Sequence, residues 1–325
     1  MPFSITRAAH IEFRVTDLER ARAFYVDTLG FVETARGADR LYLGALEERD
    51  LYSLILRKAE SPGVGHLAFR VSDAADLPRL ADLYSSHGRP VRWMKDGDDH
   101  HGPAVRVQDP TGLPIEFFSA IPQRDRLLQR FDLYRGAHVM RLDHFNCQVT
   151  DVEHAHKWFT ERLGFACSEY TVNDQDKLWA TWLRRKQDVH DLALMNGIGP
   201  RVHHGGFWVC DTSSVLRACD VLAAAGYADR IERGPGRHGL SNAFFLYIRD
   251  PDGNRIELYT SDYLIPDPDW SPIRWHINDP RRATFWGHKP PPSWFDEASL
   301  VESIETGELL PTSAPPLGDR PEFVT

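Results

Sequence analysis

A set of two histidines and one glutamate, residue types that can hold a divalent metal ion, occurs twice in this chain. A single histidine that begins a strand is usually structural, but three such residues at equivalent positions favour a metal site. Two imidazoles and one carboxylate form the facial arrangement that suits non-haem Fe(II) and leaves positions open for substrate and oxygen. These residue types alone indicate oxygen or hydrolytic chemistry at a metal. The sets are His144, His204 and Glu257 in the second half and His10, His66 and Glu116 in the first.

The two sets occupy equivalent places because the chain repeats itself. The segment AAHIEFRVTDLERARAFYVDTLGF near the start matches RLDHFNCQVTDVEHAHKWFTERLGF near residue 141. Both segments end in L-G-F, with Gly30 and Gly164 placed as helix C-caps. In the same way GHLAFRVSDAADL matches HHGGFWVCDTSSV, and QDPTGLPIEFFSA matches RDPDGNRIELYTS. Each half therefore contains two related units.

Each unit predicts one strand, an amphipathic helix that begins near an Asp or Ser, and three strands separated by turns such as D-P-T-G and D-P-D-G. We predict an α+β fold of four β-α-β-β-β modules, at residues 8–60, 64–120, 141–198 and 202–262, paired into two domains. Residues 1–137 would form a catalytically inactive domain, and residues 138–298 a catalytic domain with a wrapping segment rich in Pro and Trp. Residues 299–325 are expected to form a partly mobile tail.

Further polar side chains share the strand faces of the second set. Because strand side chains alternate between faces, Asn146 lies on the face of the first histidine, and Arg255 and Tyr259 lie on the face of Glu257. Tyr247, in the preceding strand, is another candidate for this cavity. Asn146 could equally be a turn or core amide, and Tyr247 a core aromatic.

The overall composition favours a small-molecule substrate. The chain of 325 residues has a formal net charge of −9, without the basic field that nucleic acid or an anionic membrane requires. No stretch approaches the roughly 18 to 20 apolar residues of a membrane span. The four cysteines have neither a C-x-x-C pair nor the density of a disulfide scaffold. We therefore expect a cytoplasmic protein that binds neither nucleic acid nor membrane.

Longer stretches carry a resemblance to a known family. They are RLDHFN, the V-H-D around His190, GPRVHH, RIERGPGRHGLSNAFFLYIRDPDGNRIELYT, the paired Arg281 and Arg282, and PSW near the end. These stretches resemble the extradiol catechol dioxygenases of the vicinal oxygen chelate superfamily, and among them the 3,4-dihydroxyphenylacetate (homoprotocatechuate) 2,3-dioxygenases. The resemblance spans nearly the whole chain, from about Ile11 to Ala298. The RIERGPGRHG run is typical of a subgroup and is not merely a feature of the fold.

The resemblance implies a role for each matching residue and a homotetrameric enzyme. It implies that the second set holds Fe(II), or Mn(II), for which the same ligands serve. It further implies an acid/base at His190, Asn146 beside the oxygen site, a substrate pocket lined by Trp182, His238 and Tyr247, and Arg233 and Arg282 at the substrate's carboxylate.

The implied reaction is extradiol (meta) cleavage in aromatic compound catabolism. Both atoms of O2 would enter a carboxylated catechol, 3,4-dihydroxyphenylacetate, which opens between C2 and C3. Arginine recognises a carboxylate through two parallel hydrogen bonds, and His238 would add a third donor. The alternative from the residues alone is that the two arginines pair with acidic neighbours such as Glu232 or Asp279.

Three other functions remain open at this point. The enzyme could cleave another catechol, or it could be a glyoxalase-type metal isomerase, because one fold supports several metal chemistries. A binding module of the bleomycin-resistance type uses the same paired units without catalysis.

The first set is predicted to be a relic that carries no catalysis. Glu12 stands where the second half has Asn146, and Tyr52 replaces His190. Arg106 replaces Tyr247, and a cation that points into a metal cavity would oppose the ion. Three possible ligands nevertheless remain, so the sequence leaves open whether this set binds a metal.

Overall fold

The first half of the chain forms one mixed sheet. The structure is a computed structural model that describes residues 3–95 and 100–321. In the first sheet the order of its 8 strands is β2-β3-β4-β1-β5-β8-β7-β6. The elements are β1 (Ile5–Val15), α1 (Leu18–Arg22), η1 (Ala23–Thr28), β2 (Val32–Arg36), β3 (Arg40–Gly44), β4 (Leu54–Lys58), β5 (Gly63–Val71), α2 (Asp76–Ser86), β6 (Val91–Met94), β7 (Ala104–Gln108) and β8 (Pro114–Phe118).

The second half forms another sheet, after a connecting segment at residues 119–138. Its strand order is β14-β15-β16-β13-β9-β12-β11-β10-β17, with β18 beside β13. The elements are η2 (Phe131–Leu133), β9 (Val139–Val149), α3 (Val152–Lys157), η3 (Trp158–Arg162), β10 (Ala166–Val172), β11 (Leu178–Arg184), β12 (Leu192–Asn196), β13 (Arg201–Val209), α4 (Thr212–Ala224), η4 (Ala228–Arg230), β14 (Ile231–Arg237), β15 (Phe244–Arg249), β16 (Arg255–Thr260), β17 (Ile273–His276), α5 (Pro280–Ala283), α6 (Ser293–Asp296) and β18 (Ser299–Leu300).

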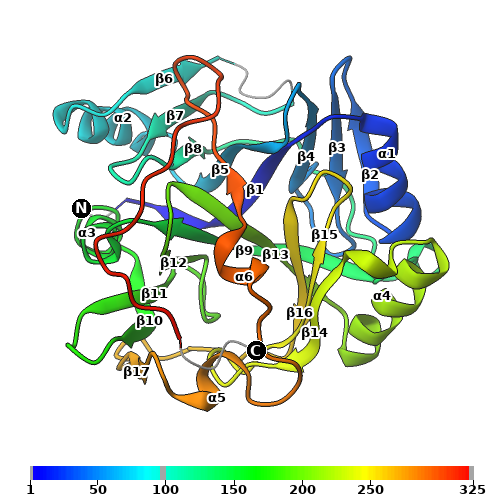
Figure 1. Cartoon of the computed structure of the whole chain (residues 1–325). Helices are drawn as coiled ribbons and strands as arrows, with labels where there is room; N and C mark the ends of the chain where they lie inside the picture. Colours follow the sequence, from blue (N-terminus) through cyan, green and yellow to red (C-terminus); the bar gives the residue numbers. More distant parts are fainter. Residues whose placement is uncertain (1–2, 96–99, 322–325) are drawn as a thin grey trace.

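The predicted fold of four β-α-β-β-β modules is confirmed. In each module the last strand lies parallel to the first, as in β1 with β4 and β9 with β12. The first strands of paired modules run antiparallel, β1 with β5 and β9 with β13. Figure 1 shows the blue and cyan N-terminal sheet above the green and yellow C-terminal sheet, with helices on the outside. The repeat therefore places β9, β13 and β16 side by side.

A hydrophobic core joins the two halves. The ring of Phe69 packs edge-on against Phe145 at 5.6 Å, and Phe31 packs against Phe207 at 5.0 Å, each pair crossing between the halves. In β9, alternate residues such as Phe145 and Cys147 face this core, so Asn146 faces the opposite side. Burial of apolar side chains on one face of the strand thus fixes which polar side chains face the site.

The helices begin and end close to the expected residues. Asp17, Asp151 and Asp211 accept hydrogen bonds from backbone N–H groups of the first turns of α1, α3 and α4. Gly30 and Gly164 follow the first helical segments of the two halves with φ of 86° and 76°, a conformation that glycine adopts without strain. The π-helical turns η1 and η3 that precede them were not predicted. None of the helices in the described ranges is long and apolar enough to cross a membrane.

The segment predicted to be a partly mobile tail contacts both halves of the chain in its described part, residues 299–321. The strand β18 pairs with β13, and Ser313 exchanges backbone hydrogen bonds with Gly199. Glu302 pairs with Arg14 and Arg57 of the first half, and Asp319 accepts a hydrogen bond from Asn173. The orange-to-red segment in Figure 1 accordingly runs over both sheets. Isolated backbone pairs, polar contacts and a few buried apolar residues such as Val301 and Ile304 hold this segment, and these leave no periodic pattern in the sequence.

Candidate metal centre and active site

Three adjacent strands bring the second set of ligands together. His144 comes from β9, His204 from β13 and Glu257 from β16, and all three side chains are buried. The Nε2 atoms of the histidines are 3.3 Å apart, and Glu257 Oε2 lies 3.0 Å from His144 Nε2 and 3.3 Å from His204 Nε2. Gly206 makes room for this approach, because a Cβ atom there would lie 2.2 Å from the His144 ring.

These distances fit one face of an octahedral ion. A metal–ligand bond of about 2.1 Å places neighbouring ligands of an octahedron about 3.0 Å apart. The observed separations of 3.0–3.3 Å are close to that value. Three protein ligands on one face leave the opposite face open. The residues present therefore fit a divalent ion that must also bind a substrate.

Neighbouring side chains fix the tautomers of both histidine ligands. Asp143 Oδ2 lies 3.3 Å from His144 Nδ1, so Nδ1 carries the proton. The Trp294 carbonyl can only accept, so His203 donates to it from Nε2 and accepts at Nδ1 from His204 Nδ1 at 2.7 Å. When both histidines are neutral, they direct unprotonated Nε2 atoms at Glu257. Three lone pairs at this distance require a cation among them.

Electrostatics support the same conclusion. Burial disfavours ionisation of Glu257, but hydrogen bonds with His144 and His204 outweigh it and hold the pKa well below its ordinary value. Burial, only partly offset by Glu257, lowers the pKa of His204 to about 4. Burial also opposes protonation of His144, yet Asp143 and Glu257 raise its pKa to about 9. In the absence of a metal, a proton on His144 therefore fills the cation's role.

A cavity with aromatic walls opens from the three ligands. It is lined by His190, Asn146, Tyr247, Tyr259, Trp182, His238, Arg233 and Arg282, and by the unpredicted Trp179, Met195, Leu240, Trp294 and Phe295. Every site residue that the resemblance implies therefore lies at this one cavity, as does Tyr259, which strand alternation placed on the face of Glu257. Arg255 does not, because it pairs with Glu232 and donates to the carbonyl of His203.

His190 packs against the candidate ligand His144, in surroundings that disfavour its protonation. Its ring lies 4.0 Å from that of His144, and its buried Nδ1 has no hydrogen-bond partner among the described residues. Burial, and secondly the neighbouring His144, lowers the pKa of His190 well below its ordinary value. A neutral imidazole at this position can take a proton.

The two arginines of the cavity make no ion pair with any carboxylate in the described ranges. Glu232 pairs with Arg255 and Arg249, and Asp279 pairs with Arg281, so the acidic neighbours are already occupied. Arg233 donates to the Ala283 carbonyl and the Thr284 hydroxyl and lies over the ring of Trp294 at 4.4 Å. Arg282 lies over the ring of Trp179 at 5.2 Å. Burial lowers the pKa of both guanidinium groups to about 10.

The structure does not give His238 the donor role expected for it. Its Nδ1 faces the Ala283 carbonyl, which can only accept, so Nδ1 carries the proton. Nε2 then accepts from the Tyr247 hydroxyl at 2.8 Å. Burial, and secondly Arg233, lowers the pKa of His238 to about 3, so the ring stays neutral. His238 therefore orients Tyr247 in the cavity wall.

Sequence reasoning missed the residues that support the ligands. Asp143 and His203 each immediately precede a histidine ligand, and the D-H and H-H pairs could have indicated them. Trp294 accepts from His203 and packs on Tyr247 at 4.3 Å, but it comes from α6, far along the chain. Local spacing could not have placed it.

Comparisons with known proteins agree with this geometry. Residues 7–117 and 141–258 match the model of the Glyoxalase/Bleomycin resistance protein/Dioxygenase superfamily. A solved homoprotocatechuate 2,3-dioxygenase from Arthrobacter globiformis is 43% identical, with a TM-score of 0.93 over 96% of this chain and 97% of that one. The Brevibacterium fuscum enzyme, solved as an anaerobic complex with 3,4-dihydroxyphenylacetate, is 41% identical, with a TM-score of 0.93 over 96% and 98%.

A more distant relative has a different named substrate. The manganese-dependent 2,3-dihydroxybiphenyl 1,2-dioxygenase of Geobacillus genomosp. 3 is 30% identical over 299 residues, which cover 88% of this chain and 95% of that protein.

Proposed function

The chain belongs to the glyoxalase/bleomycin resistance protein/dioxygenase superfamily, and on this premise we propose that it is an extradiol dioxygenase that opens 3,4-dihydroxyphenylacetate between C2 and C3. One observation carries the proposal beyond the family. Two buried arginines that pair with no carboxylate of residues 3–95 and 100–321 share a cavity with three candidate ligand atoms that require a cation. A catechol that bears a short carboxylate side chain would bind the metal ion through its hydroxyl groups and the arginines through its carboxylate.

The residues that would hold the metal are His144, His204 and Glu257, with Asp143 and His203 fixing the two imidazoles. A bound Fe(II) or Mn(II) supplies Lewis-acid and redox chemistry, because it stabilises negative charge on the catechol oxygens and exchanges electrons with O2. Isomerases of the glyoxalase type use such a site as well, but the unpaired arginines and the dioxygenase relatives favour ring cleavage.

We assign the proton transfer to His190. A catechol must lose its second hydroxyl proton near neutral pH, and a neutral imidazole beside His144 can accept it. The buried Nδ1 of His190 has no competing partner among the described residues, so the ring is free to bind a proton and return it to the product. Asn146, whose Oδ1 also lacks a partner in that part of the chain, lies at the same end of the cavity, where O2 would bind.

The aromatic walls exclude water and orient the ring. Trp179, Trp182, Trp294 and Phe295 line the cavity that also contains the candidate ligands and the two arginines. Removal of water strengthens the interaction of a substrate carboxylate with the guanidinium groups, because the local dielectric constant falls.

We also propose a cytoplasmic homotetramer, and sedimentation analysis measures the oligomeric state.

Replacing Arg282 with alanine is expected to raise the KM for 3,4-dihydroxyphenylacetate about 10- to 100-fold, the range of one charge-assisted hydrogen-bond pair. The KM for 4-methylcatechol, which has no carboxylate, should change little. Initial rates of oxygen uptake on both substrates measure the difference. Arg281→Ala is the matched control, because Arg281 lies on the same helix α5 but is exposed and pairs with Asp279. Equal effects of Arg282→Ala on the two substrates would remove the carboxylate role.

A substrate panel tests the proposed function itself. We expect the highest kcat/KM with 3,4-dihydroxyphenylacetate and lower values with catechol, 4-methylcatechol and 2,3-dihydroxybiphenyl. A preference for unsubstituted or biphenyl catechols would refute the substrate but leave the metal assignment intact. No oxygen uptake with any catechol in iron-loaded protein would refute the enzyme class.

A further inference from the structure

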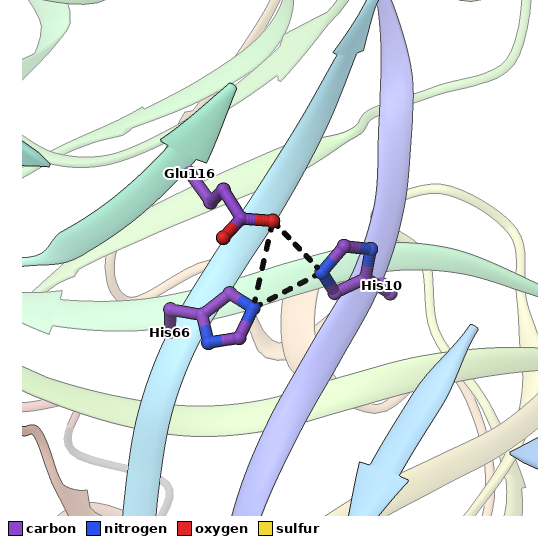
Figure 2. A group of neighbouring side chains, drawn as sticks. All are labelled: His10, His66 and Glu116. Carbon is purple, nitrogen blue, oxygen red and sulfur yellow. Dashed lines mark hydrogen bonds and ion pairs between the residues drawn. The ribbon is translucent and has the colours of Figure 1, made fainter. Parts of the chain in front are cut away.

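The structure also assembles the first set of candidate ligands. His10 of β1, His66 of β5 and Glu116 of β8 converge in the N-terminal sheet, and each is fully buried (Figure 2). The histidine Nε2 atoms are 3.0 Å apart, and Glu116 Oε1 lies 3.3 Å from His10 Nε2 and 3.9 Å from His66 Nε2. This geometry is close to that of the C-terminal set, so distances alone do not distinguish a metal site from an empty copy of one.

The charge at the two clusters differs. The Nε atom of Arg106 lies 2.6 Å from Glu116 Oε2, and its Nη2 lies 3.5 Å from His66 Nε2. Arg106 is the cross-strand neighbour of Glu116, and Tyr247 is the cross-strand neighbour of Glu257 in the same register. No lysine or arginine in the described ranges pairs with Glu257. Glu116 Oε1 also lies 3.0 Å from Nε2 of the buried His101. The N-terminal carboxylate therefore has a guanidinium group and a third histidine beside it, whereas the C-terminal carboxylate has no lysine or arginine partner in the described ranges.

The tautomers also differ. In the C-terminal half Asp143 and His203 hold the Nδ1 protons of the ligands, but the equivalent positions before His10 and His66 are Ala9 and Gly65. The buried Nδ1 of His10 has no hydrogen-bond partner among the described residues. His10 can therefore carry its proton on Nε2 and donate to Glu116. Arg106, His101 and the imidazole protons together satisfy this cluster without a metal ion.

We propose that the guanidinium group of Arg106 takes the place of a metal ion at the cluster of His10, His66 and Glu116. The wild-type chain then binds a single metal ion, in its C-terminal half. The N-terminal cluster is a latent divalent-metal site, and Arg106 prevents it from binding a metal ion. Replacing Arg106 with tyrosine, the residue at the equivalent C-terminal position, allows the cluster to bind one.

The test counts metal ions. Wild type, Arg106→Tyr and Arg106→Gln are loaded with Mn²⁺, desalted and analysed by elemental mass spectrometry. We expect one equivalent per chain in wild type and two in both variants. Combining either substitution with His66→Ala should return the count to one. Arg92→Gln is the matched control, because Arg92 is the exposed cross-strand neighbour of Arg106 on β6 and carries the same charge.

Thermal unfolding is a second measurement, and it distinguishes a change in metal binding from misfolding. Without metal, Arg106→Gln should unfold at a lower temperature than wild type, because the buried Glu116 loses its ion pair with the Arg106 guanidinium group. Added Mn²⁺ should raise the Tm of this variant but not that of its His66→Ala combination. Two equivalents in wild type, reduced to one by His66→Ala, would overturn the proposal, as would one equivalent in both Arg106 variants. A count of zero in wild type and one in the variants would refute the C-terminal metal site but not the latent one.

Discussion

Replacing His204 with alanine is expected to abolish both tight metal binding and ring cleavage. The substitution leaves two protein ligands, and even the loss of a residue that only supports a ligand typically weakens metal affinity about 10- to 100-fold. We therefore expect a loss of more than about 100-fold. Metal content after desalting and oxygen uptake on 3,4-dihydroxyphenylacetate measure the two effects.

The fold of this variant should survive, because the removed ring faces the cavity and not the core. His66→Ala is the matched control, since His66 is the equivalent residue of the N-terminal half, and it should keep both metal and activity. Stoichiometric metal with near-normal oxygen uptake in His204→Ala would show that the ligand set is wrong. Loss of activity in His66→Ala would refute the relic interpretation of the N-terminal cluster.

Replacing His190 with phenylalanine should keep the metal and slow turnover by about 10²- to 10⁴-fold, the contribution of a positioned acid/base. Phenylalanine preserves the ring that packs on His144, and Nδ1 has no described hydrogen-bond partner that the change would leave unsatisfied. The effect should therefore appear in kcat and not in metal content or Tm. Single-turnover rates, measured by the appearance of the yellow ring-opened semialdehyde, distinguish an effect on the chemical step from an effect on product release.

His154→Phe serves as a control, because His154 is exposed on α3. A kcat within a few fold of wild type in His190→Phe would remove His190 from the mechanism. A loss of metal in that variant would show instead that His190 acts by supporting His144.

The sequence alone could predict the modules and the ligands because both repeat. Aligned repeats place His10 over His144 and Glu116 over Glu257, and the structure has these residues on equivalent strands. Strand alternation likewise placed Asn146 in the cavity. Such patterns depend on local periodicity, which the sequence records directly.

Contacts between distant segments could not be predicted in this way. Glu232 pairs with Arg255 and Asp279 pairs with Arg281, so neither neutralises Arg233 or Arg282, and only the folded chain shows those pairings. The role of Trp294 depends on how α6 crosses the site. The sequence indicated that Arg106 replaces Tyr247, but only the folded chain shows that its guanidinium group reaches Glu116.

The most direct test of the central claim follows oxygen and product together in one reaction. Fe(II)-loaded protein is mixed with 3,4-dihydroxyphenylacetate while an oxygen electrode and the visible absorbance are recorded. We predict one equivalent of O2 consumed for each equivalent of catechol, with stoichiometric formation of a yellow ring-opened semialdehyde. Consumption of the catechol to a colourless product, or to a coloured one without uptake of O2, would contradict extradiol cleavage at this site.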